Sequence, residues 1–146
     1  MIDIENLVFD TVYNQLSVLH TSANITAGYE ETNAVYPAVI VRQTNSQPYR
    51  QSATDDSSEN HTRVTFEIDV YSDKKDKGRS ECKDILADAD AIMQSMKFRR
   101  VHMNRPLNVD RTIWRQYARY EVIVGKPVVH DVGTENERTV YQMYRR

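Results

Sequence analysis

The sequence predicts an α+β domain in which a single curved, mostly antiparallel sheet carries two amphipathic helices on one face. Three observations predict it: an alternating strand, a helix-spaced apolar stripe directly after it, and a second such stripe at the start of the chain. A strand buried on one face needs a cover, and an amphipathic helix needs a surface on which to pack. With 146 residues and 40% apolar content, the chain fits one domain, residues 1–146.

The first helix is predicted over residues 4–21, with Asp3 as a candidate cap. Its apolar side is formed by Ile4, Leu7, Val8, Val12, Leu16 and Leu19. Polar and small residues at 22–33 then predict a connection, in which residues 24–29 are a candidate for a short extended piece.

Two paired strands are predicted next. Residues 38–44 follow Pro37 and open with an apolar run, so we expect a strand buried on both sides at its start. It should pair with residues 64–71, where apolar and polar residues alternate, so that one side meets a core and the other meets solvent or a partner. The segment between them is too long for a tight hairpin and too polar to build a core, which predicts a mobile loop at about 45–60.

The second helix follows a charged turn at residues 72–78. Its apolar stripe consists of Cys82, Ile85, Leu86, Ala89, Ile92, Met93 and Met96. We expect Ser80 to be its N-cap and Glu81 to lie near the positive end of the helix dipole. The opposite side, with Asp84, Asp88 and Asp90, is interpreted as a solvated face.

The last third of the chain predicts further strands, at 98–103 and 112–124, separated by a turn that contains Pro106. In the longer strand, Trp114, Ala118, Tyr120, Val122 and Val124 share one face. The other face is apolar and aromatic at both ends, from Ile113 to Ile123, which predicts a partner surface. Residues 138–146 alternate like a final strand and form a strand-like tail able to pair with a neighbour.

Composition excludes several classes of function. Nineteen basic and 21 acidic residues give a net charge of −2, which argues against a dedicated nucleic-acid binder. The single cysteine excludes an internal disulfide, and the chain contains neither a signal-peptide pattern nor an apolar run of membrane-spanning length, so we expect a soluble protein that folds in a cytoplasm. Four isolated glycines exclude a glycine-rich phosphate loop, so no cofactor is expected.

Residues with catalytic or ligating chemistry are few. His20, His61, His102 and His130 are scattered, so no metal site is predicted. Cys82 is a candidate nucleophile activated by the helix dipole and by His61 or His102, but its position on the apolar stripe favours a core residue. The basic run Lys74, Lys75, Lys77, Arg79 and Lys83 is interleaved with acidic residues, which favours a solvated turn over a phosphate or partner contact. We therefore expect no enzyme.

Tyrosine is unusually frequent, with nine tyrosines against three phenylalanines. Tyrosine combines a large contact area with a hydroxyl that tolerates water, so it is typical of partner surfaces. The candidates for such contacts are Tyr49, Tyr117, Tyr141 and Tyr144.

Several segments of the chain together resemble a known family. They are YPAVIVRQ at 36–43, ENH at 59–61, FEIDVYS at 66–72, SECK at 80–83, DRTIWRQYARY at 110–120 and YRR at 144–146. These segments, in this order, resemble the tail terminator or tail completion proteins of tailed bacteriophages and related prophage particles. The resemblance implies a small α+β domain that assembles as a hexameric ring on the end of the finished tail tube. That ring stops tube growth and offers the surface that joins the tail to the capsid.

The resemblance also implies partners and a location. The partners would be further copies of the chain, the tail tube protein, a head-completion or connector protein and, in a contractile tail, the sheath protein. No membrane and no specific nucleic acid is implied, although the genome would pass through the ring lumen. The location would be the virion, at the head–tail junction, after assembly in the host cytoplasm.

Contact residues can be predicted on this basis. We expect the loop at 45–60 to become ordered on docking to the tube, with tube contacts at Tyr49, Arg50, Asp55 and Asp56. Candidates for subunit or partner interfaces are Tyr117, Arg115, Arg119, Tyr141, Tyr144 and Arg145. Two alternatives remain open: another neck or tail component, such as a head-completion protein or tube subunit, and a small enzyme of nucleotide or nucleic-acid metabolism using His61, Cys82 or His102.

Overall fold

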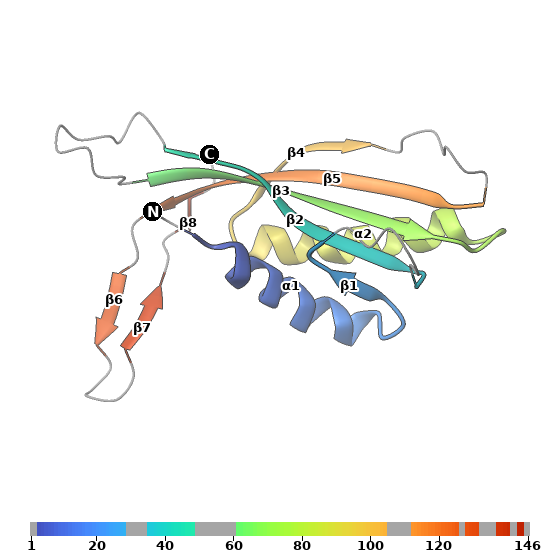
Figure 1. Cartoon of the computed structure of the whole chain (residues 1–146), viewed down its shortest axis with the longest axis horizontal. Helices are drawn as coiled ribbons and strands as arrows, with labels where there is room; N and C mark the ends of the chain where they lie inside the picture. Colours follow the sequence, from blue (N-terminus) through green and yellow to red (C-terminus); the bar gives the residue numbers. More distant parts are fainter. Residues whose placement is uncertain are drawn as a thin grey trace.

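The computed structural model describes residues 3–28, 35–48, 61–104, 112–125, 128–131, 137–140 and 143–144. Its elements, in chain order, are α1 (Glu5–Leu19), β1 (Asn24–Thr26), β2 (Ala38–Pro48), β3 (His61–Ser72), α2 (Gly78–Ser95), β4 (Arg99–Asn104), β5 (Trp114–Gly125), β6 (Val128–Asp131), β7 (Glu137–Val140) and β8 (Met143–Tyr144). Figure 1 shows a sheet with both helices beneath it.

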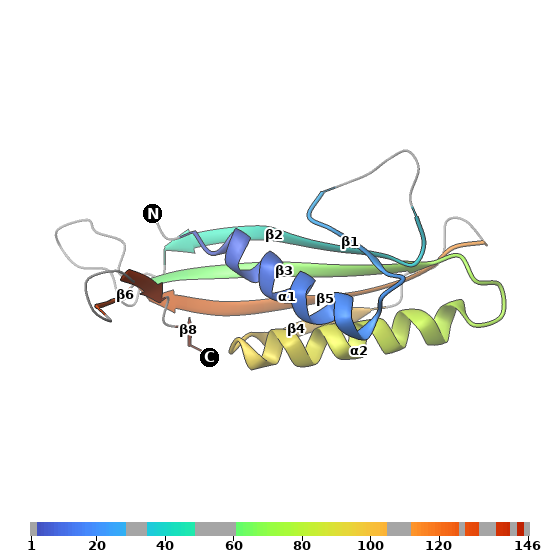
Figure 2. The ribbon, with the colours of Figure 1, turned by 90° about the horizontal axis from the view of Figure 1, so that it is seen from below.

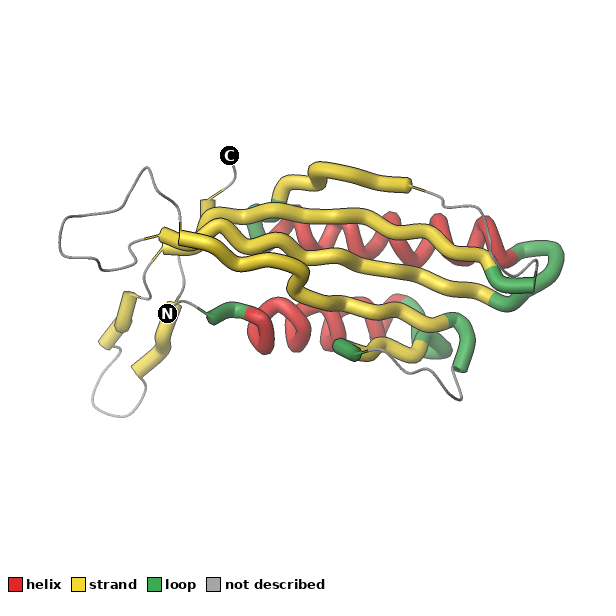
Figure 3. Tube along the Cα trace, turned by 45° about the horizontal axis from the view of Figure 1, so that its top comes forward, coloured by secondary structure: helices red, strands yellow, loops and turns green. Residues whose placement is uncertain are grey.

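The main sheet has six strands and is not closed. Five of them follow the order β1-β2-β3-β5-β4, and β8 pairs with the end of β5. β1 runs parallel to β2, whereas the pairs β2–β3, β3–β5, β4–β5 and β5–β8 are antiparallel. α1 packs against β2 and α2, while α2 packs under β3, β5 and β4 (Figures 2 and 3). The predicted fold class, a curved and mostly antiparallel sheet with two helices on one face, is confirmed.

The core lies between the sheet and the helices. Alternation in β3 sends Val64, Phe66, Ile68 and Val70 towards the helices, and all four are buried. The predicted apolar stripes of the two helices face these residues, and their buried side chains are Val8, Val12, Leu16, Cys82, Ile85, Leu86, Ala89, Ile92 and Met93. The prediction is wrong for Leu7 and Leu19, which are 46% and 60% exposed, because Leu7 lies at the border of the stripe and Leu19 is the last residue of α1. The rings of Phe66 and Phe98 meet edge to face with their centroids 5.6 Å apart, which ties the end of α2 to the middle of the sheet.

The two helix starts differ from the prediction in detail. At α1 the Asp3 carboxylate accepts a hydrogen bond from the Glu5 backbone N–H at 3.0 Å, although Ile4 holds the cap position. At α2 the prediction of Ser80 as N-cap is wrong, because the helix already begins at Gly78 and Ser80 lies inside its first turn. Glycine is needed at this start, since a Cβ on Gly78 would collide with the indole ring of Trp114. Glu81 does lie in the first turn, as predicted.

The strand β2 is longer and less buried than predicted. Val39 and Val41 are buried but their neighbours are only half-buried, so the expectation of burial on both sides is wrong. The strand also continues to Pro48, because Asn45 to Pro48 pair with residues 62–65 of β3 after a bulge at residues 43–45. The start of the predicted loop at 45–60 therefore belongs to the sheet, and the rest of it lies outside the described residues.

The C-terminal part also differs. The predicted strand at 98–103 is β4, and the long strand is β5, which starts at Trp114 and ends at Gly125. The strand-like tail at 138–146 is not one strand, because Glu137–Val140 pairs with β6 in a separate two-stranded sheet and Met143–Tyr144 pairs with β5. No helix in the described part of the chain is long and apolar enough to cross a membrane.

Candidate functional site: an arginine-covered sheet face

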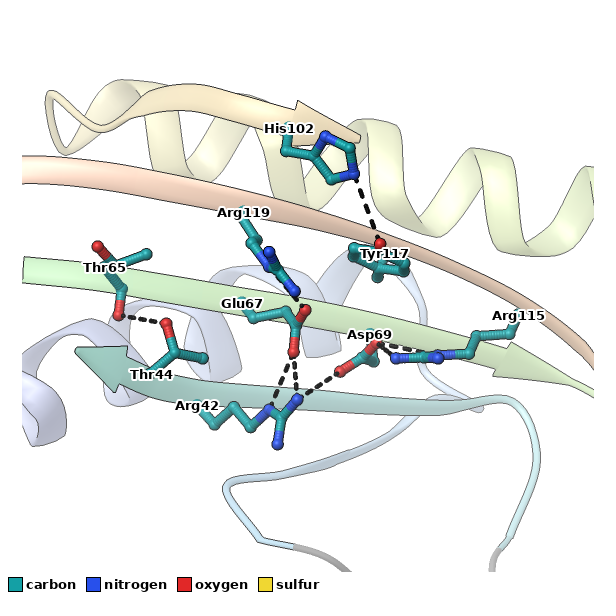
Figure 4. A network of polar contacts seen from close by, with 9 residues as sticks. All are labelled: Arg42, Thr44, Thr65, Glu67, Asp69, His102, Arg115, Tyr117 and Arg119. Carbon is teal, nitrogen blue, oxygen red and sulfur yellow. Dashed lines mark hydrogen bonds and ion pairs between the residues drawn. The ribbon is translucent and has the colours of Figure 1, made fainter. Parts of the chain in front are cut away.

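The face of the sheet opposite the helices carries a connected group of charged and aromatic side chains. We call it the arginine face and define it by Arg42, Glu67, Asp69, Arg115, Tyr117 and Arg119 (Figure 4). Strand pairing explains the grouping, because Glu67 stands in register with Arg42 of β2 and with Arg119 of β5. Directly opposite residues on one face of a sheet are close enough for their side chains to interact.

Glu67 lies between two arginines. Arg42 donates to one carboxylate oxygen from Nε at 3.1 Å and from Nη2, and Arg119 donates to the other oxygen from Nε at 3.2 Å. Burial by itself would raise the pKa of Glu67, but the hydrogen bonds and charges of Arg42 and Arg119 outweigh it and hold the pKa below its ordinary value. Glu67 is therefore ionised and compensated at neutral pH.

Asp69 has a weaker set of partners. Arg115 donates to one oxygen from Nε at 3.1 Å and from Nη2 at 2.7 Å, whereas Arg42 Nη2 lies 4.0 Å from the other oxygen. Burial raises the pKa of Asp69 and the nearby charge of Glu67 adds to it, so that Arg115 and Arg42 compensate only in part. The two neighbouring carboxylates of β3 thus have pKa values shifted in opposite directions.

Aromatic rings hold the arginines in place. The Arg115 guanidinium carbon lies 5.7 Å from the ring centroid of Tyr71 and 5.0 Å from that of Tyr117, and the Arg119 carbon lies 5.6 Å from the Tyr117 centroid. His102 of β4 adds a ring contact with Tyr117, with centroids 5.8 Å apart. Tyr117 therefore lies between two guanidinium groups and a histidine.

Burial differs sharply between the anions and the cations of this face. The side chains of Glu67 and Asp69 are each only 3% exposed, whereas those of Arg42 and Arg119 are 42% and 51% exposed. Solvent therefore meets guanidinium and phenol groups, and the carboxylates lie beneath them. Such an arrangement suits contact with a partner better than proton transfer, because the arginines shield both carboxylates from an incoming molecule.

Three of the interface candidates from the sequence come together here, namely Arg115, Tyr117 and Arg119. Tyr144 does not join them, because it pairs opposite Ile123 at the far end of β5 and its ring lies 5.7 Å from that of His61. The other predicted contact residues lie outside the described part of the chain: Tyr49, Arg50, Asp55, Asp56, Tyr141 and Arg145.

The sequence reading missed the residues at the centre of this face. It assigned Glu67 and Asp69 to a side that meets solvent or a partner, but arginines from both neighbouring strands bury them. It also counted Ile123 as an outward apolar contact, whereas Ile123 is buried beside β8. The sequence nevertheless contains a signal for this face. Glu67 and Asp69 lie on one predicted strand, and Arg115 and Arg119, which carry the opposite charge, lie on another.

The candidate residues for catalysis do not form one pocket. Cys82 is buried under the sheet, with its Sγ 3.7 Å from the Val70 carbonyl oxygen and 3.5 Å from that of Trp114. Burial, with the nearby charge of Glu81, raises the pKa of its thiol to about 11, which opposes thiolate formation. His102 lies on the opposite face, and His61 lies at the far end of β3, opposite Gly125. Within the described ranges, no three His, Cys, Asp or Glu side chains gather in a way that could hold a metal ion.

The aspartates of α2 correct another expectation. Asp88 Oδ2 lies 2.6 Å from Nε2 of His20, the residue that follows α1. Asp90 accepts hydrogen bonds from the Tyr120 hydroxyl at 2.8 Å and from Arg100 at 3.2 Å. Burial and the bond to Asp90 raise the pKa of Tyr120, so its hydroxyl stays a donor. The prediction of a solvated face is therefore confirmed for Asp84, which is exposed, and wrong for Asp88 and Asp90, which link the helix to the end of α1 and to the sheet.

The basic turn before α2 is also partly paired. Lys74 forms an ion pair with Glu81, which also accepts a hydrogen bond from the Ser72 hydroxyl at 3.1 Å. This pairing accords with the interpretation of the run as a turn with interleaved charges.

No protein-family model matches the chain, and no curated protein matches it either. The function is therefore inferred from the arginine face and from the resemblance described above.

Proposed function

We propose that this protein is a structural virion component that forms a ring on the end of a phage tail tube, ends tube polymerisation and provides the surface that joins the tail to the capsid. The observation that carries the proposal is the arginine face, a broad surface of arginine and tyrosine side chains on three long paired strands. Arginine and tyrosine are, with tryptophan, the residues enriched at binding hot spots.

The stiffness of this surface supports an assembly role. Arg115 is held by the Asp69 carboxylate and by the rings of Tyr71 and Tyr117, so little side-chain entropy remains to be lost on docking. A ring component that docks once, without chemistry, needs a surface of this kind and no reactive centre. The resemblance to tail terminator proteins includes residues 66–72 and 110–120, which contain the parts of β3 and β5 that carry Glu67, Asp69, Arg115, Tyr117 and Arg119.

The positions of the candidate residues support the two alternative functions to different degrees. An enzyme built on His61, Cys82 and His102 needs these side chains in one pocket, and their separation on different faces gives it no support. Another position in the tail or neck, such as a tube subunit or head-completion protein, would use a contact surface of the same kind.

A tube-capping experiment separates these positions. Purified protein is added to tail tubes from the particle that encodes it and to growing tube protein, and tube length is measured by negative-stain imaging. A terminator forms rings on tube ends and stops growth. Lengthening of the tubes by the added protein would instead identify a tube subunit, and absence of any binding to tubes would contradict the proposal.

A further inference from the structure

The exposed apolar side chains are concentrated in two places. In the described part of the chain, eight large apolar side chains are exposed, and six of them lie on α1 or β4. On α1 they are Leu7, Tyr13, Val18 and Leu19, and on β4 they are Val101 and Met103. Val18 is 75% exposed, although the opposite side of the same helix is fully buried. Apolar groups gathered in this way mark contact surfaces.

The charges around these two patches are opposite in sign. α1 contains Glu5 and Asp10 but no lysine or arginine, and Asp10 is exposed one turn from both Leu7 and Tyr13. β4 contains Arg99 and Arg100 but no aspartate or glutamate, and all six of its residues are exposed. Arg100 is ion-paired with Asp90 of α2, so Arg99 carries the positive charge of this patch. One patch is therefore acidic and apolar and the other basic and apolar, which makes them complementary to each other.

Their positions on the domain are also suited to mutual contact. α1 packs near the β2 side of the sheet, whereas β4 is the last strand at the opposite edge (Figure 2). Two different complementary patches on opposite sides of a subunit generate a head-to-tail contact, which is the type of contact that closes into a ring.

We propose that the solvent side of α1 in one copy of this chain binds the β4 edge of the next copy. Leu7, Tyr13 and Val18 then cover Val101 and Met103, and Asp10 lies near Arg99. The inference rests on the proposed ring function for its setting, and it names the two surfaces through which the ring closes. A second copy is the occupant favoured here because each patch finds its complement, in both charge and apolar character, on the same chain.

Charge reversal tests this contact. Asp10→Lys makes the α1 patch basic, and Arg99→Glu makes the β4 patch acidic. Self-association is measured by analytical ultracentrifugation over a wide concentration range and by counting rings on tube ends. We expect each single variant to associate at least about tenfold more weakly than the wild type, since like charges then meet at every contact.

Restored association in a mixture of the two single variants is a sharper test than weakened association of each variant alone. In an equimolar mixture of the two single variants, the basic α1 patch of one meets the acidic β4 patch of the other, and the reverse contact is the unaltered pair. The mixture, and also the double variant Asp10→Lys/Arg99→Glu, should regain association to within about threefold of the wild type. Val18→Ser should weaken association without restoration by mixing, because it removes apolar contact.

The control is Lys83→Glu, a reversal at an exposed position of α2 outside both patches, which should leave association unchanged. Thermal unfolding of each variant reports whether it is folded. If the wild type forms rings that both single reversals leave intact, the inference is wrong and the proposed function stands. If the mixture or the double variant regains binding to tubes but does not self-associate, the patches bind the tube protein instead of a second copy. A wild type that associates neither in solution nor on tubes would overturn both proposals.

Discussion

The two faces of the same sheet are buried in different ways. Phe66 and Glu67 are neighbours in β3, and both are buried, but Phe66 points into a core made by helices and Glu67 points into a layer made by arginines. The helix-covered face gains its stability from apolar area removed from water. The arginine face exchanges hydration of two carboxylates for ion pairs, which contributes little net stability but holds the exposed side chains in one arrangement.

Burial of a side chain on a sheet does not by itself identify a hydrophobic core. Where the buried groups are carboxylates under half-exposed arginines, the surface is ordered in advance for contact.

Truncation on the helix-covered face should have the largest effect. Phe66→Ala leaves a cavity between β3 and Phe98, and we expect it to lower the free energy of unfolding by about 3–5 kcal/mol. Urea denaturation measures this change in the free energy of unfolding. A loss as small as that of a substitution at an exposed position, such as Gln15→Ala, would show that the core is not where the fold places it.

Neutralisation on the arginine face should have a smaller and uneven effect. Glu67→Gln removes the charge that compensates Arg42 and Arg119, and we expect a loss of about 1–3 kcal/mol at neutral pH. Asp69→Asn keeps an oxygen that can accept from Arg115 and removes a carboxylate whose pKa burial raises, so its cost should be below about 1 kcal/mol. Equal losses from the two isosteric variants would contradict the different environments described for them.

The pH dependence of stability tests the same difference between Glu67 and Asp69. The pKa of Glu67 is lowered from 4.5, so its ionisation stabilises the fold above that pH, and this stabilisation is lost as the pH falls through the lowered pKa. The pKa of Asp69 is raised from 3.8, so its contribution is present below 3.8 and is lost as the pH rises through the raised pKa.

The two variants should therefore diverge as the pH rises. Relative to the wild type, Glu67→Gln should become less stable as the pH rises towards 4.5, and Asp69→Asn should become more stable as the pH rises above 3.8. Urea unfolding at a series of pH values measures both differences, and slopes of the same sign would refute the assignment.

The smallest effect concerns the end of α2. Lys97 has a positive φ of 72°, while the Lys97 and Phe98 backbone N–H groups donate to the Gln94 and Met93 carbonyl oxygens at 3.0 and 3.1 Å. Glycine adopts this conformation without strain, so Lys97→Gly should raise the free energy of unfolding by about 0.5–1 kcal/mol. Lys83→Gly is the matched control, since it lies inside the helix and should cost about 1 kcal/mol.

Local patterns of the sequence were sufficient for the fold class. The alternation in β3, the stripe of α2 and the position of Pro37 before β2 each depend on residues close together in the chain. The arginine face could not be predicted in the same way. Glu67 is buried there because β3 lies between β2 and β5. This order brings Arg42, 25 residues before Glu67, and Arg119, 52 residues after it, into contact with the same carboxylate.

Two further predictions are wrong for a similar reason. The polar character of residues 45–48 predicts a loop, but these residues pair with β3 and form part of β2. The preference of serine for the cap position predicts Ser80 as the N-cap, whereas the helix begins at Gly78, against which the Trp114 ring lies. In each case a contact distant in sequence outweighs a local preference.

The measurement that tests the account most directly is the fraction of tail tubes capped by the wild type and by the double variant Arg115→Ala/Arg119→Ala, compared at equal concentrations of folded protein. The account predicts that the wild type caps tube ends and that the folded double variant caps at least about tenfold fewer of them, because the rigid contact groups are gone. Undiminished capping by the folded double variant would contradict the assignment of the arginine face as the docking surface.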